Sequence, residues 1–150
     1  MKKSVLNRTV SELLRRSGSG VTVKLHSYFP GGRLIGGKYA MRAHSVTMYT
    51  EVIKQQCLQL FGTLEPVYEY FAVVFAHELG HAADVSLSKL CDELDTCGDE
   101  FRRKTIALQI EENAWNNAMS WIMDIDPILI RTIVDQSLES YRAELAPVTA

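Results

Sequence analysis

The longest apolar run of the chain leads directly into two histidines and a glutamate, and this segment constrains the fold most. Residues 70–76 are almost wholly apolar, and the pentapeptide His-Glu-Leu-Gly-His follows at residues 77–81. A helix that is apolar on nearly every side has to be buried, and we expect one at residues 66–86. Polar side chains beside such a face cost free energy unless they are paired or bind a ligand. The segment therefore predicts a buried helix that carries a functional site.

Helical periodicity of the apolar residues predicts four further helices. They cover residues 4–16, residues 50–61, residues 100–123, and a last segment that starts at Asp126-Pro127 and has Tyr141 and Leu145 on its apolar face. Asp99 is the expected N-cap of the 100–123 helix, because its carboxylate can accept a hydrogen bond from a free N–H of the first turn. Residues 87–99 are acidic and polar, so they predict a loop with at most one helical turn.

Alternation of apolar and polar residues predicts a small sheet between the first two helices. Segments 21–27 and 44–52 alternate in this way, and the two Gly-Gly pairs within residues 31–37 predict turns around a short strand. The expected fold class is α+β, with a small, mostly antiparallel three-stranded sheet packed on a mainly helical domain. A length of 150 residues fits one domain, residues 1–150.

Charge and cysteine content exclude several classes of protein. The formal net charge is −2 and the basic residues are scattered, so the chain lacks the basic surface that binds nucleic acid. The apolar run at residues 70–76 is far shorter than the roughly 20 residues of a membrane-spanning helix, and we expect no secretory signal. The three cysteines include no C-x-x-C pair, which favours a reducing, cytoplasmic location. A Cys91–Cys97 disulfide is the alternative.

The H-E-x-x-H spacing of residues 77–81 suits a metal site. Residues four apart lie on the same face of an α-helix, so His77 and His81 can direct both imidazoles at one point, as two zinc ligands must. Glu78 then lies beside the metal, where it can take a proton from the activated water and pass it to a leaving amine. Gly80 lacks a side chain, which allows another element to lie close. We expect one Zn²⁺ per chain and Glu78 as the catalytic base.

The third metal ligand is expected to be a carboxylate. The other two histidines, His26 and His44, belong to the predicted sheet, and no histidine follows the pentapeptide. Glu111 shares one face of the 100–123 helix with small and aromatic residues that favour close packing of helices. Glu112 lies one residue further round, so Glu111 is favoured but both remain candidates.

Residues 77–81, followed thirty residues later by Glu111-Glu-Asn-Ala-Trp115, resemble the gluzincin metallopeptidases. The chain is most similar to the small ImmA/IrrE-type domains and related minigluzincins, over about residues 44–123. In that group a short sheet precedes the motif helix, and a later helix carries a Glu-x-x-Ala pattern whose glutamate is the third zinc ligand. The resemblance therefore implies a zincin-like fold and favours Glu111 as the ligand. Trp115 stands where the group often has Asn.

The resemblance also implies a substrate. Such proteins often occur in phages and mobile elements, and the better-known members cleave repressor-like regulators, so we expect a protein or peptide substrate. The strand at residues 44–50 is a candidate edge strand on which an extended peptide could pair, with an internal strand, or a strand covered by the N-terminal helix, as the alternatives. His44, Tyr49 and Tyr141 are candidates for stabilising the oxyanion of the transition state.

These features predict a zinc-dependent endopeptidase. The alternative is a zinc-containing regulatory or binding module with little or no proteolytic activity, in which Asp84 or Glu112 would complete a closed site as the fourth ligand. In the peptidase, Asp84 would instead accept an imidazole N–H and fix its tautomer, or be a solvated surface carboxylate. The presence of Glu78 favours the peptidase, because a purely structural site needs no base.

Overall fold

The computed structural model describes residues 1–147, and this range forms six α-helices, one short 3-10 helix and three strands. The helices are α1 (Lys3–Ser17), α2 (Thr50–Phe61), α3 (Val67–Ala82), α4 (Leu87–Thr96), α5 (Glu100–Ala118) and α6 (Pro127–Ala143), and the 3-10 helix is η1 (Met119–Trp121). The strands are β1 (Thr22–His26), β2 (Gly37–Ala40) and β3 (Ser45–Tyr49). These helices and strands confirm the predicted α+β class.

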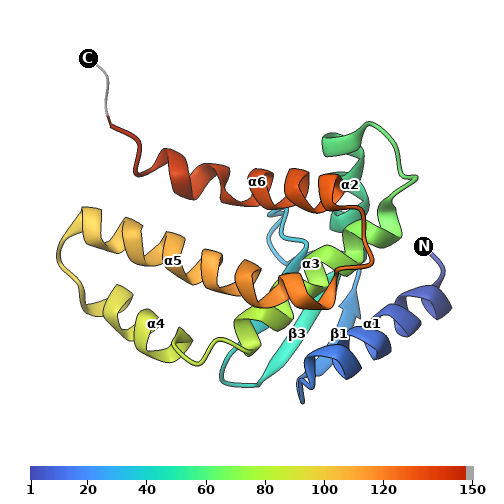
Figure 1. Ribbon diagram of the computed structural model, residues 1–150, viewed down its shortest axis with the longest axis horizontal. Coiled ribbons are helices and arrows are strands. Elements are labelled where there is room, and N and C mark those ends of the chain that lie inside the picture. Colours follow the sequence, from blue (N-terminus) through green and yellow to red (C-terminus); the bar gives the residue numbers. More distant parts are fainter. Residues whose placement is uncertain (148–150) are drawn as a thin grey trace.

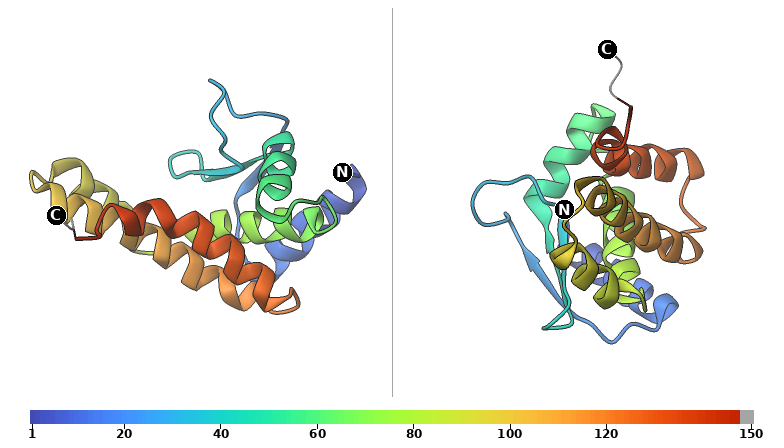
Figure 2. Two further views of the ribbon diagram at one scale, coloured as in Figure 1. Left: turned by 90° about the horizontal axis from the view of Figure 1, so that it is seen from above. Right: turned by 90° about the vertical axis from the view of Figure 1, so that its left-hand side faces the viewer.

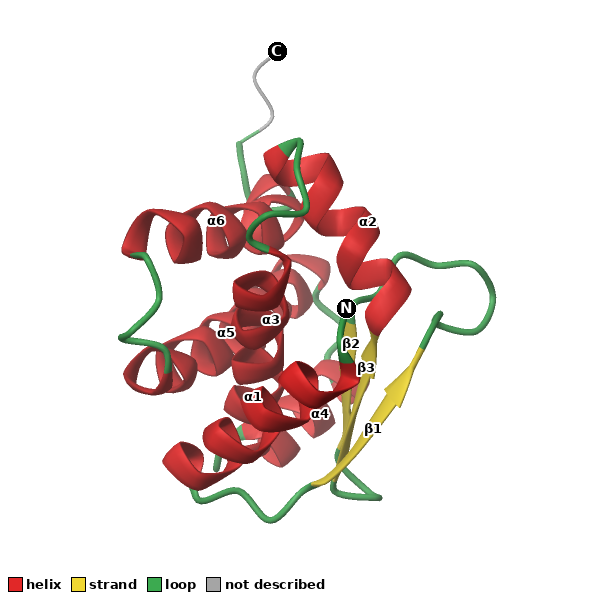
Figure 3. Ribbon diagram, turned by 90° about the vertical axis from the view of Figure 1, so that its right-hand side faces the viewer, coloured by secondary structure: helices red, strands yellow, loops and turns green. Residues whose placement is uncertain are grey.

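The apolar segment forms α3, and the other elements pack around it. Helix α3 contacts α1, α2, α5, α6 and the strands β2 and β3. Figure 1 shows it crossing the middle of the molecule, and Figure 3 shows the sheet on one side with most of the helices on the other. Helices α5 and α6 lie side by side in Figures 1 and 2. The burial that the apolar composition of residues 70–76 predicts is therefore confirmed.

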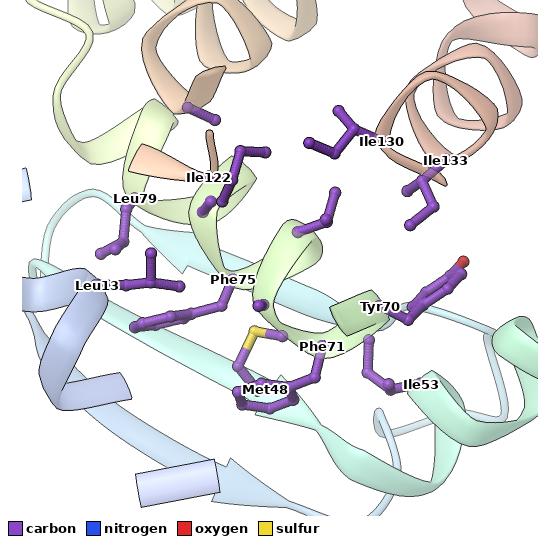
Figure 4. Close-up of a cluster of buried hydrophobic side chains, with 14 of the residues drawn as sticks. Leu13, Met48, Ile53, Tyr70, Phe71, Phe75, Leu79, Ile122, Ile130 and Ile133 are labelled. Carbon is purple, nitrogen blue, oxygen red and sulfur yellow. The ribbon is translucent and has the colours of Figure 1, made fainter. Parts of the chain in front are cut away.

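The buried side chains form one cluster around α3 (Figure 4). Phe71 and Phe75 of α3 are fully buried and stack with their ring centroids 6.2 Å apart. Met48 comes to them from β3, and Leu13 comes from α1. Burial of a large apolar side chain contributes about 1.5–3 kcal/mol, so this cluster is the main source of stability.

Among residues 1–147, no helix combines the length and the apolar composition that a membrane crossing requires.

The sheet is mixed, and its strand order is β1-β3-β2. Strand β3 pairs in parallel with β1 and antiparallel with β2, so the predicted mostly antiparallel sheet is wrong for one of the two pairings. After β1, the connection at residues 27–36 skips the central position of the sheet, so β2 lies at the opposite edge from β1. The turn after β2 then places β3 between the two. The candidate edge strand at residues 44–50 is therefore the central strand. The edge strand beside α3 is β2.

Residues 87–99 are not the predicted loop, because most of them form α4. Leu87 is buried and Leu94 follows it two turns later on the same face, which packs on α5. Asp92 and Asp95 point to solvent, and this exposed acidic face is what resembled a loop in the sequence.

The three cysteines, Cys57, Cys91 and Cys97, are free thiols.

The helix starts are predicted better than the helix ends. The carboxylates of Asp99 and Asp126 accept hydrogen bonds from the first turns of α5 and α6, at 3.2 and 2.9 Å, so both starts are confirmed. Three predicted helices are too long, since α3 ends at Ala82, α5 at Ala118 and α6 at Ala143. Caps mark a start with a specific side chain, whereas these ends carry no such signal.

Candidate metal centre

The last turn of α3 places His77 and His81 beside each other, as their spacing predicts. Their ring centroids are 4.6 Å apart. Ligand atoms of His77, Glu78 and His81 all lie within 4.8 Å of one another, so this group can hold a metal ion. His77 and Glu78 are only 7% and 6% exposed. Polar groups buried this deeply need a partner, which is consistent with a ligand at this point.

Glu111 reaches the two histidines from α5. Its Oε2 atom lies 2.9 Å from Nε2 of His81 and 3.8 Å from Nε2 of His77. Tetrahedral zinc with bonds near 2.0–2.1 Å holds its ligand atoms about 3.3 Å apart, and the two distances lie on either side of this value. Glu112 lines neither of the two clefts that contain Glu111. The geometry therefore favours Glu111 over Glu112 as a ligand.

Gly80 allows α5 to lie this close to α3. A Cβ atom at Gly80 would overlap the backbone carbonyl group of Ala114. Asn117, one turn further along α5, donates a hydrogen bond to the Gly80 carbonyl oxygen at 3.0 Å. Glu111 lies one turn before Ala114 on the same face. The close crossing of the two helices therefore sets the distance from Glu111 to the histidines.

One nitrogen of His77 has no hydrogen-bond partner within the described part of the chain. Its Nε2 atom is buried, and Oε2 of Glu111 is 3.8 Å away, beyond hydrogen-bond distance. A buried nitrogen without a partner costs about 1–3 kcal/mol. A metal ion between these atoms would satisfy the nitrogen, and two imidazoles with one carboxylate are a donor set that Zn²⁺ accepts. The residues present therefore fit a zinc ion.

The charges at the site favour a cation. Burial by itself lowers the pKa of His81, but the hydrogen bond to Glu111 and the charges of Glu78, Glu111 and Asp84 outweigh it and raise that pKa. Burial by itself raises the pKa of Glu111, but the hydrogen bond to His81 and the charges of both histidines lower it. The carboxylates thus stabilise positive charge at the imidazoles, which is the sign of charge that a metal ion brings.

Asp84 lies at the junction between α3 and α4. Its Oδ1 atom accepts a hydrogen bond from the Ser86 N–H at 2.9 Å, and its Oδ2 atom accepts one from Asn113 at 3.3 Å. The carboxylate therefore ties the end of α3 to α5 and to the start of α4. Within residues 1–147, the Asp84 carboxylate accepts these two hydrogen bonds, and neither comes from an imidazole N–H.

The three aromatic or histidine candidates for oxyanion stabilisation lie in different places. His44 is in the turn between β2 and β3, exposed, with a left-handed φ of 48° and its Nδ1 atom 2.9 Å from the Tyr39 hydroxyl. Tyr49 is buried at the end of β3, where its ring contacts Phe29 edge-on. Tyr141 of α6 lines the same cleft as His77 and Glu78. Of the three, Tyr141 is the residue that the structure brings to the candidate metal centre.

Two clefts meet at the candidate metal centre. The larger, of about 460 Å³, lies between the segment before β2, helix α2 and helix α6, and reaches His77, Glu78 and Glu111. The smaller, of about 300 Å³, lies between β2 and α4 and reaches Glu78, His81 and Glu111. Glu78 and Glu111 line both clefts, so an extended ligand could pass over these two carboxylates from one cleft to the other.

Two contacts at the site are missed by sequence reasoning. The indole of Trp115 stacks on the His77 imidazole, and Ser137 of α6 accepts a hydrogen bond from that indole. The aromatic residue one turn after Glu111 was a signal for helix packing, but its contact with His77 depends on the crossing of α3 and α5. No sequence pattern points to Ser137.

Comparisons with protein-family models, with curated proteins and with solved structures find no match to this chain.

Proposed function

We propose that this chain is a zinc-dependent endopeptidase of the gluzincin type, with a zincin-like fold. The observation that carries the proposal is the convergence of the Nε2 atoms of His77 and His81 on one carboxylate oxygen of Glu111. Three ligands from two helices leave one position of a tetrahedron open for water or substrate, as catalytic zinc sites do. Glu78, buried next to His77, is in place to act as the base.

The side chains around the site have separate roles in the proposed reaction. When bound, zinc would act as a Lewis acid and would lower the pKa of a water molecule at the site to about 7. Glu78 accepts a proton from the attacking water and then transfers it to the nitrogen of the leaving amine. Tyr141 donates a hydrogen bond to the carbonyl oxygen of the scissile peptide as negative charge develops there. His77, His81 and Glu111 keep the metal in place.

The proposed substrate is an extended segment of a protein that pairs with β2. Gly37, Lys38 and Tyr39 of β2 line the smaller cleft together with Glu78 and His81. The Tyr49 N–H donates to the Gly36 carbonyl oxygen at 2.8 Å, so by alternation the backbone groups of Gly37 and Tyr39 point away from β3. They are available for an added strand. A repressor-like regulator in the cytoplasm is the substrate class that the family resemblance suggests.

A second candidate function is a zinc-containing regulatory or binding module without hydrolysis. It is favoured by one observation, because the Glu78 carboxylate belongs to the group whose ligand atoms lie within 4.8 Å of one another. If Glu78 coordinates the metal together with His77, His81 and Glu111, the site has four protein ligands and no open position. The role of Glu78 therefore separates the two candidates.

The first experiment measures metal content per chain after purification without added metal. We expect about one zinc in the wild type, a sharp loss in Glu111→Ala, and the wild-type content in the control Glu112→Ala. An absence of metal in the wild type, even after zinc is supplied, would contradict both candidate functions.

The second experiment uses Glu78→Gln, which keeps the size of the side chain. If Glu78 is the base, this variant keeps its zinc but loses peptidase activity by several orders of magnitude, because proton transfer alone contributes about 10²–10⁴-fold. If Glu78 is a ligand, the variant loses zinc. A variant that binds zinc and cleaves the substrate at the wild-type rate would contradict the peptidase mechanism.

A further inference from the structure

Trp115 makes the closest aromatic contact of the metal centre. Its indole stacks on the imidazole of His77, with ring centroids 4.3 Å apart and an angle of 27° between the planes. Trp115 is only 3% exposed and lies on α5 one turn after Glu111. Helix α5 therefore brings two side chains to the site, one directed at the metal position and one against the face of a ligand ring.

The indole is itself held from a third helix. Its Nε1–H group donates a hydrogen bond to Oγ of Ser137 on α6 at 3.1 Å. The buried face of the ring contacts His77 and the edge is fixed by Ser137, so rotation of the indole would break one of these two contacts. A chain of contacts therefore runs from α6 through Trp115 to His77.

Within residues 1–147, the ring nitrogens of His77 make one hydrogen bond, to Glu78, and the ring also lies against His81. Imidazole ligands of metals are normally oriented by a hydrogen bond from their second nitrogen to a carboxylate, a carbonyl group or water. At His77, the Nδ1 atom faces Oε1 of Glu78 at 3.3 Å. In the proposed reaction Glu78 has to accept and release a proton, so it cannot also hold the ring in one orientation throughout.

We propose that Trp115 is a positioning residue of the metal centre, which holds the His77 ring in its ligating orientation, and that Ser137 locks the indole in place. The inference rests on the proposed zinc site. It gives α6 a part in metal binding although α6 contributes no ligand. It also assigns a role to Trp115, at a position where the family that this chain resembles often has Asn.

The test is the affinity for Zn²⁺, measured by competition with a chelator of known affinity. Loss of a residue that orients a metal ligand typically costs 10–100-fold in affinity, and we expect a loss of about this size in Trp115→Leu. Ser137→Ala removes one hydrogen bond to the indole, and we expect a loss of about threefold. Trp121→Phe is the matched tryptophan control and should leave the affinity unchanged.

A second control separates positioning from loss of stability. Leu138 is buried on α6 next to Ser137 and lines neither cleft of the metal centre. Leu138→Ala should lower the melting temperature but leave the affinity for Zn²⁺ at the wild-type value. If Leu138→Ala and Trp115→Leu weaken zinc binding equally, the effect of Trp115 is general destabilisation and the inference is wrong.

Fluorescence gives a direct readout of the stack. The chain has two tryptophans, so Trp121→Phe reports on Trp115 alone and Trp115→Phe reports on Trp121 alone. Co²⁺ bound between the histidines should quench Trp115 strongly, because the indole contacts a ligand ring. We expect strong quenching in Trp121→Phe and much weaker quenching in Trp115→Phe.

The outcomes distinguish this inference from the proposed function. A wild type that binds neither Zn²⁺ nor Co²⁺ would overturn both. A wild type that binds Zn²⁺, with folded Trp115→Leu and Ser137→Ala variants of unchanged affinity, would overturn the role of Trp115 alone. If Trp115→Leu does not fold, Ser137→Ala and the quenching of Trp121→Phe decide the question, and unchanged affinity with weak quenching would overturn the inference.

Discussion

Tyr141 of α6 brings a hydroxyl group to the site that the side chains of α3 form. Its hydroxyl lies 3.5 Å from Oε1 of Glu111, at the outer limit of a hydrogen bond, and it lines the cleft with His77 and Glu78. Burial and the charge of Glu111 raise the pKa of Tyr141, so the phenol remains a proton donor at neutral pH. This is the state that oxyanion stabilisation requires.

We therefore expect Tyr141→Phe to lower kcat about 10²-fold, the size of effect seen when one oxyanion donor is removed. KM and zinc content should stay near the wild-type values, because the substitution leaves the ligands and β2 in place. Steady-state kinetics and metal analysis of the same preparation test this. A loss of zinc in Tyr141→Phe would instead assign the hydroxyl to holding Glu111.

The residues of the site differ in how far the sequence predicts them. His77, Glu78 and His81 belong to one helical turn, so local geometry alone places their side chains together. The helix face and the family resemblance favoured Glu111 but left Glu112 open, because the choice depends on the crossing of two helices. His44 was a reasonable candidate by residue type, but its position in a turn follows from strand pairing that one sequence does not reveal.

At the scale of helices, the crossing of α3 and α5 depends on Gly80. Alanine is the better helix former by about 1 kcal/mol, so Gly80→Ala would stabilise an isolated helix. In the protein its Cβ atom would overlap the Ala114 backbone, which cannot move without separating α3 from α5. Overpacking typically costs about 1–3 kcal/mol and occasionally more, and an overlap with backbone belongs at or above the upper end of this range, so the clash exceeds the gain in helix propensity.

The expected result is that Gly80→Ala lowers the free energy of unfolding by at least about 2 kcal/mol, the difference between these two effects, and weakens zinc binding because Glu111 moves away. Chemical denaturation and chelator competition measure the two changes. Gly98→Ala is the matched control, since a Cβ atom there meets nothing within 4 Å. Equal stability of the two variants would show that α3 and α5 separate at little cost, which would contradict this prediction.

Helix α1 is tied to the segment after η1 by a group of exposed charges. Arg16 pairs with Glu12 at 2.9 Å and with Asp124 at 2.8 Å. Hydrogen bonds from Arg15 and Arg16 lower the pKa of Glu12 from 4.5 to about 2. A carboxylate whose pKa is lower in the folded state stabilises the fold above its unfolded pKa, and this contribution disappears as the pH falls through the folded value.

Glu12→Gln should therefore be less stable than the wild type above about pH 4.5, and the difference should shrink as the pH falls and vanish below about pH 2. The effect is small, because exposed pairs are screened by water and salt. Urea denaturation of both proteins across this range of pH tests the sign. A difference that grows as the pH falls would contradict the assigned pairing.

Elements with a strong apolar pattern were predicted more accurately than the contacts between them. The apolar residues 70–76 and the H-E-x-x-H spacing that follows them favour a buried helix, and α3 has this form. Helix α4 was missed because its exposed acidic face dominates its composition, while its buried face is narrow. The central position of β3 follows from a crossing connection, and no local pattern encodes that.

At the scale of the whole molecule, the candidate metal centre lies where most of the elements meet. Helix α3 supplies His77, Glu78 and His81, α5 supplies Glu111 and Trp115, and β2, α4 and α6 line the clefts on either side. A metal ion at this point would therefore link separate parts of one hydrophobic cluster. Binding to the folded chain alone stabilises it by mass action, so zinc should be coupled to unfolding of the molecule.

Removal of zinc by a chelator should lower the melting temperature of the wild type. With free zinc at about 100 times the dissociation constant, binding stabilises the fold by about 2.7 kcal/mol. In a domain of this length each kcal/mol shifts the melting temperature by about 2–4 °C, so the expected decrease is about 5–11 °C. Scanning calorimetry with and without chelator measures it, and Glu112→Ala should show the full decrease while Glu111→Ala shows little. A wild-type transition that does not respond to zinc would mean that the three ligands do not hold a metal in the folded state.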